Sequence, residues 1–139
     1  MRFLFLFVLM ALGLASPALA VDKKPDLYVC KITKGISHTN WISESTAFIV
    51  YSDTQVKVLD DAIMYFFKEA QDVKSKRRGQ ELRLNWSLGG MVDSKNTRVP
   101  QFRYNAKLNT KTLAVSISAR PLGFENRYFG QGTCVKRKK

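Results

Sequence analysis

Cys30 and Cys134 are the only two cysteines of the chain and its only candidates for thiol chemistry. A zinc cluster or a Cys-His pair would need more ligands or partners than two cysteines and one histidine provide. In an oxidising compartment the two thiols have only each other to pair with. We therefore expect a disulfide between Cys30 and Cys134, and no metal site.

The first 20 residues determine which compartment applies. Residues 1–20 (MRFLFLFVLMALGLASPALA) contain one arginine, an apolar run and a final Ala-Leu-Ala, which is the layout of a secretory signal peptide. The apolar run of about 12 residues is shorter than the roughly 20 that a membrane-spanning helix requires. We expect cleavage after Ala20, a periplasmic or secreted product, and no transmembrane anchor.

Few other residues suggest catalysis. His38 is the only histidine and stands in a polar loop without a Gly-x-Ser-x-Gly nucleophile motif, which favours an ordinary loop role. Asp60 and Asp61 are adjacent acids at a possible helix start, which favours capping over acid–base chemistry. Gly89-Gly90 lacks the Lys-Ser/Thr of a phosphate-binding loop, and Gly130-x-Gly132 opens no helix. We predict no enzyme activity and no cofactor, and assign the last two glycines to close packing or a bulge.

Basic residues are the remaining candidates for function. Removal of residues 1–20 takes away Arg2 and no acid, so the formal charge of +12 becomes +11. Such an excess favours attraction to anionic partners, although it also keeps a small exported domain soluble and monomeric. The predicted anion-binding residues are a cluster and three strand residues: Lys74, Lys76, Arg77, Arg78, Arg83, Arg103 and Lys107.

The elements that would position these cations are mostly strands. Apolar and polar residues alternate over 26–33, 82–88, 102–108 and 112–119, and 47–52 with 55–59 suggests a hairpin. Leu108 opposite Leu113 would place the apolar residues of the second hairpin on one side. The expected core contains Leu84, Trp86, Tyr104, Leu108, Val115 and Ile117.

Three segments are less regular. Residues 60–79 fit a helix with one apolar stripe, and less well a buried strand followed by a basic hairpin arm. Residues 89–101 contain two glycines and a proline, which predicts a flexible connection. Trp41 belongs to a loop, where packing over one end of the fold is favoured over an exposed contact.

The overall expectation is a mainly β fold of seven to eight antiparallel strands, with a helix possible at 61–78. Cysteines in the first and last strands would join the sheet edges, which favours a small barrel or a closed sandwich. The domains are a signal peptide at 1–20, one β-rich domain at 21–135 and a basic disordered tail at 136–139.

Neighbouring strands would gather Arg83, Arg103 and Lys107 into a basic patch bordered by Asn85, Asn105, Ser116 and Ser118. Nucleic-acid-binding sheets interleave cations with stacking aromatic residues, whereas Trp86, Phe102 and Tyr104 have inward parity here. Sequence-specific nucleic acid is therefore not an expected partner.

The segment RPLGFENR at 120–127, followed by GQGTC at 130–134 and preceded by the hairpin RYNAKLNTKTLAVSIS, resembles small exported proteins of Gram-negative bacteria. The resemblance implies a periplasmic β-domain and transfers no ligand residue. The plan of one cysteine near each end is similar to periplasmic lysozyme inhibitors, but a clear Ser-Gly-x-x-Tyr inhibitory loop is missing.

The favoured function is non-enzymatic binding of an anionic partner: a polyanion, an anionic lipid, or an acidic envelope component or protein. The alternative is an envelope structural or interaction protein, or an inhibitor, with incidental charge.

Overall fold

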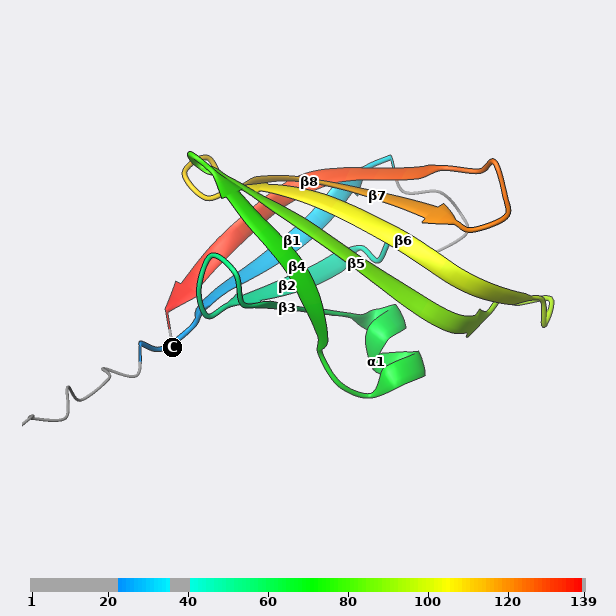
Figure 1. Ribbon diagram of the computed structural model, residues 1–139. Helices are drawn as coiled ribbons and strands as arrows, with labels where there is room; N and C mark the ends of the chain where they lie inside the picture. The colour runs from blue at the N-terminus through cyan, green and yellow to red at the C-terminus, as the bar shows by residue number, and fades with distance from the viewer. Residues whose placement is uncertain (1–22, 36–40, 139) are drawn as a thin grey trace, which may run out of the picture.

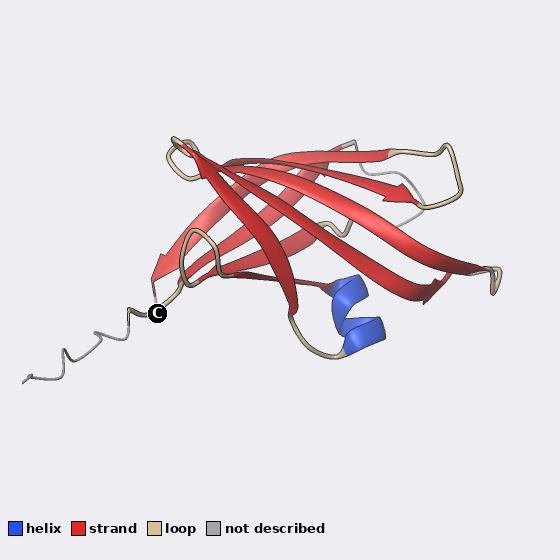
Figure 2. Ribbon diagram, viewed as in Figure 1, coloured by secondary structure: helices blue, strands red, loops and turns tan. Residues whose placement is uncertain are grey.

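The computed structural model describes residues 23–35 and 41–138 and folds them into eight antiparallel strands and one short helix (Figures 1 and 2). Each strand pairs with the next and the last pairs with the first, so the sheet closes into a barrel. The predicted mainly β class is confirmed, and the barrel decides between the two predicted architectures. The strands are β1 (Asp26–Lys34), β2 (Ser45–Val50), β3 (Val56–Asp60), β4 (Gln71–Arg78), β5 (Glu81–Val92), β6 (Arg98–Asn109), β7 (Ala114–Pro121) and β8 (Tyr128–Lys138).

The barrel interior is filled by the apolar residues that alternate along each strand. Phe48, Leu82, Leu84 and Leu108 are fully buried, and they come from three strands, β2, β5 and β6. Burial of this apolar surface is the main favourable term in folding. The predicted core is confirmed, because all six of its residues are buried: Leu84, Trp86, Tyr104, Leu108, Val115 and Ile117.

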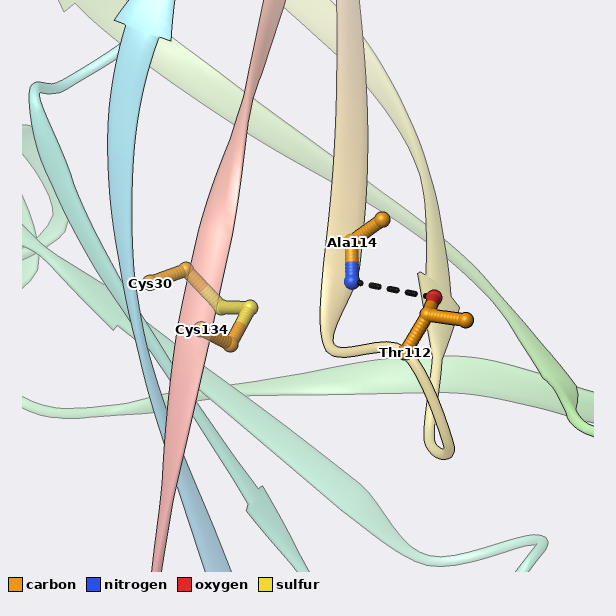
Figure 3. Close-up of a disulfide and its surroundings, with 4 residues drawn as sticks. All are labelled: Cys30, Thr112, Ala114 and Cys134. Atoms are coloured by element: carbon orange, nitrogen blue, oxygen red, sulfur yellow. Dashed lines mark hydrogen bonds between the residues drawn. A yellow bond between two sulfur atoms is a disulfide. The ribbon is translucent and has the colours of Figure 1, made fainter.

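A disulfide closes the barrel between its first and last strands. Cys30 of β1 and Cys134 of β8 are direct partners in the ladder, and their sulfur atoms are bonded (Figure 3). The ladder shifts register between Ile32 and Lys34. A Cβ atom on Gly132 would collide with the backbone carbonyl of Lys31, so the strands approach closely only because the residue is glycine. The predicted disulfide and the predicted role of the glycine are both confirmed.

Residues 60–79 combine the two alternatives that the sequence left open. Helix α1 (Asp61–Phe67) begins at Asp60, whose carboxylate accepts a hydrogen bond from the backbone N–H of Ile63 at 2.8 Å, and it ends at Lys68 with φ of 63°. The chain then enters β4 and turns into β5 at Gly79, where φ is 58°. The predicted capping role of Asp60 is confirmed, but a helix through the basic cluster is wrong.

Two further predictions about hairpins are corrected. Residues 89–101 are mostly paired strand, because β5 continues to Val92 and β6 begins at Arg98. Pro100 is tolerated there because β7 joins β6 only from Phe102 onwards, which leaves the proline on an edge. In the next hairpin Leu108 faces Val115, two residues beyond the predicted register, because the turn extends to Leu113.

The predicted disordered tail is also wrong for Lys136, Arg137 and Lys138. All three belong to β8 and pair with β1, and the ammonium of Lys136 lies 3.0 Å from Asp26. Lys139, His38 and the predicted signal peptide at 1–20 lie outside the described residues. Among the described residues, no helix is long and apolar enough to cross a membrane.

Candidate anion-binding face

Strands β4, β5, β6 and β7 are consecutive neighbours, and we call their outward side chains the basic face. Lys76 of β4 pairs with Arg83 of β5, which pairs with Lys107 of β6. Since neighbouring strands lie about 4.8 Å apart, these residues form one cationic row across three strands. The pairing of β5 with β6 confirms that Arg83 and Lys107 gather on adjacent strands as predicted, and Lys76 joins them from β4.

A second cationic row crosses the same face further along the strands. Arg103 of β6 pairs with Arg120 of β7, and both are exposed. Arg103 and Lys107 are four residues apart on β6, so the two rows are separated by about 14 Å. Sequence reasoning missed Arg120 because the predicted strand ended at residue 119, although Arg120 has the same parity as Ser118.

Polar side chains occupy the space between the two cationic rows. Asn85 and Asn105 are direct partners on β5 and β6, with Lys74 on one side and Ser118 on the other. Both asparagines are exposed. The face therefore presents uncharged hydrogen-bonding groups flanked by positive charge.

Negative charge on these four strands is sparse and already paired. Glu81 lies 2.6 Å from the guanidinium of Arg83, and this hydrogen bond lowers the pKa of the Glu81 carboxyl. Asp72 lies 3.0 Å from Lys57 of β3, and the contact raises the pKa of the Lys57 ammonium. The strands contain nine lysines and arginines against these two acids, so positive charge remains in excess.

Arg77 does not belong to the basic face, and its predicted place there is corrected. It has the parity of Val73, which points inward, and lies at one end of the barrel. Its guanidinium donates to Asp53 at 2.7 Å and to Thr110 at 3.2 Å, which joins two turns. Lys74, Lys76 and Arg78 alternate with it and are exposed.

Two shallow grooves mark the basic face. The first has a volume of about 550 Å³ and is lined by Lys74, Asn85, Ser87, Gln101, Arg103 and Asn105 together with Asp72, Trp86 and Tyr104. The second, of about 370 Å³, is lined by Glu81, Lys107, Asn109, Ala114, Val115, Ser116, Gln131 and Gly132. Volumes of this size suit small organic ligands or segments of a longer chain.

The aromatic residues near the grooves point into the barrel, as predicted. The rings of Trp86 and Tyr104 stack with centroids 5.1 Å apart, and the Tyr104 hydroxyl donates to the carbonyl of Trp41 at 2.9 Å. The Trp41 ring packs on Phe102 at 4.4 Å, which confirms its predicted place over the barrel end. The one buried side-chain donor that lacks a partner within the described residues is the indole N–H of Trp86.

Asp60 has a structural role at the start of α1. Burial raises the pKa of the Asp60 carboxyl, and the neighbouring charge of Asp61 adds to the effect; the same carboxylate caps α1. Within residues 23–35 and 41–138, no cluster of three or more histidine, cysteine or acidic side chains could hold a metal ion.

The protein is a closed, disulfide-joined β-barrel, and strands β4–β7 carry the lysines and arginines of the basic face. Comparison of the chain with protein-family models, curated proteins and solved structures finds no match.

Proposed function

We propose that the protein is an exported, non-enzymatic binding domain that holds a polyanionic component of the cell envelope on its basic face. The observation that carries this proposal is the arrangement of exposed cations from four adjacent strands. The two acids of these strands, Asp72 and Glu81, are both in ion pairs. Six of the predicted residues belong to it: Lys74, Lys76, Arg78, Arg83, Arg103 and Lys107.

Clustering strengthens the attraction beyond what net charge provides. Charges on one surface sum to a local potential that steers and retains an anionic chain, whereas the same charges spread over the barrel would largely be screened from one another by salt. Guanidinium groups add paired hydrogen bonds to carboxylate or phosphate oxygens. The exported location rests on the layout of residues 1–20 and agrees with the disulfide.

The test compares two double variants that remove the same charge from different faces. Lys76→Ser with Lys107→Ser changes the basic face, and Lys31→Ser with Arg137→Ser changes the outer surface of β1 and β8. Retention on heparin is measured from 50 to 400 mM salt. We expect the first variant to reduce the slope of log affinity against log salt by about two units, because about one unit is lost per phosphate-like contact.

The second variant should keep most of the wild-type slope. Equal losses in both variants would show that net charge alone causes retention, and the charge would then be incidental, as in an envelope interaction protein or inhibitor. Absence of retention at 50 mM salt would overturn the proposal outright.

A further inference from the structure

We infer that the partner of the basic face is an acidic oligosaccharide, a chain of sugar units that carries carboxylate, sulfate or phosphate groups. This inference rests on the proposed function and names the chemistry of its ligand. It comes from the side chains between the cations, which the charge argument leaves unexplained.

The grooves are lined by amide and hydroxyl side chains as well as by cations. In the first groove these are Asn85, Ser87, Gln101 and Asn105, and in the second they are Asn109, Ser116 and Gln131. Amides and hydroxyls both donate and accept hydrogen bonds, as sugar hydroxyl groups do. A partner without hydroxyl groups, such as polyphosphate, would satisfy the cations and leave this polar lining without a role.

The spacing of the grooves favours an extended chain over a single small anion. Asn105 of the first groove and Asn109 of the second are four residues apart on β6, or about 14 Å. Lys107 lies between them on the outward side of the same strand. A chain that follows β6 would therefore place sugars in both grooves and acidic groups near Lys107 and Arg103.

The basic face differs from a surface that binds single-stranded nucleic acid. Such surfaces stack bases on exposed aromatic rings, and none of the outward side chains described on β4–β7 is aromatic. An exposed ring, Phe129, lies at the margin on β8 beside Ser118, where it could cover the apolar face of one sugar. One marginal ring fits the end of a glycan better than a row of stacked bases.

Trp86 provides a spectroscopic reporter for the test. It lines the first groove, and the second tryptophan, Trp41, packs on Phe102 and can be replaced by phenylalanine. Fluorescence of the Trp41→Phe protein then reports on Trp86 alone. The probes are a hexamer of uronic acid, a sulfated hexasaccharide, inorganic polyphosphate with six charges, hexathymidylate and neutral maltohexaose.

One double variant and one single control variant, both in the Trp41→Phe background, separate the polar contribution from the charge. Asn85→Ala with Asn105→Ala keeps every cation, and Asn126→Ala in the β7–β8 loop is the matched amide control. We expect the double variant to bind the acidic hexasaccharides at least tenfold more weakly and polyphosphate within twofold of the parent. About fivefold is lost for each net hydrogen bond of ordinary strength. The Asn126 variant should bind all probes as the parent does.

Other results would overturn either the glycan inference alone or the proposed function as well. Unchanged saccharide affinity in the asparagine variant, an equal loss for polyphosphate, or hexathymidylate binding as tight as the acidic saccharides would overturn the glycan inference while leaving polyanion binding intact. If Lys76→Ser with Lys107→Ser changes the affinity of no charged probe, the proposed function fails as well. The uronate and sulfate arms show which acidic group is preferred.

Discussion

Removal of the disulfide is the perturbation whose size follows most directly from the fold. Cys30 and Cys134 close a loop of 104 residues, and in the chain-entropy model such a cross-link stabilises the folded state by about 4.7 kcal/mol. A domain of this length has a total stability of roughly 6–17 kcal/mol, at about 0.05–0.15 kcal/mol per residue. Loss of the cross-link therefore removes a large share of it.

The change is Cys30→Ala with Cys134→Ala, compared with the oxidised and the reduced wild-type protein. About 4.7 kcal/mol corresponds to a fall in Tm of about 15–20 °C, since 1 kcal/mol shifts Tm by a few degrees for a domain of this size. Circular dichroism during heating measures Tm. We expect the reduced protein and the alanine variant to melt within a few degrees of each other.

A fall of less than about 5 °C would refute this reasoning, because it would mean that the unfolded chain gains little freedom when the link is absent. The ladder between β1 and β8 would then be sufficient to close the barrel. Binding of heparin by the folded alanine variant serves as the control, because the basic face lies on β4–β7 and does not contain either cysteine.

The remaining predictions concern burial, capping and the last strand. Trp86→Asp should prevent folding because it buries an unpaired charge, whereas Arg103→Ser should change stability by less than about 0.5 kcal/mol, as chemical denaturation can measure. Asp60→Ala should lose a helix cap and about 1 kcal/mol, while Asp60→Asn keeps the cap and should be at least as stable as wild type at pH 7. The pKa of Asp60 is raised in the folded state, so wild type loses stability as pH rises from 3.8 through the folded pKa, and the advantage of Asp60→Asn should vanish below pH 3.8. Deletion of 136–139 should lower Tm by several degrees, because it removes part of β8 and the ion pair with Asp26; an unchanged Tm would show that these residues do not stabilise the barrel.

Strong period-two alternation is what made most of the barrel predictable. The strand with Leu82, Leu84 and Trp86 and the hairpin that follows residue 102 were identified because one face is almost entirely apolar. The ambiguous strand β4 has the same period, but Ser75 and Arg77 occupy its inward positions. Ser75 and Arg77 bond to Asp53 near the barrel end, a long-range contact that no local pattern reveals.

The sequence predicted most of the cations that belong to the basic face, but not which of them lie opposite one another on neighbouring strands. Parity identified Arg83, Arg103 and Lys107 as outward residues, and the pairing of β5 with β6 then brought them together. The register between β6 and β7 was wrong by two residues because the side chain of Asn109 accepts hydrogen bonds from Lys111 and Thr112 and widens the turn. A shift of two preserves which face each residue occupies, so the core prediction survived.

The seam between β3 and β4, where the two strands pair with each other, is the part of the barrel that we expect to open most readily. These strands pair only over Val56–Val58 and Gln71–Val73, whereas β5 and β6 pair along most of their length (Figure 1). Because local opening occurs where few backbone bonds must break, amide hydrogens of Gln71–Val73 should exchange faster than those in the middle of β5.

Asp72 and Lys74, on the β4 side of that seam, also line the first groove. The disulfide holds β1 to β8 far from this point in strand order, so opening at the seam leaves the barrel joined. Because Asp72 and Lys74 belong to β4, a ligand seated in the first groove should stabilise this strand against local opening and slow its hydrogen exchange.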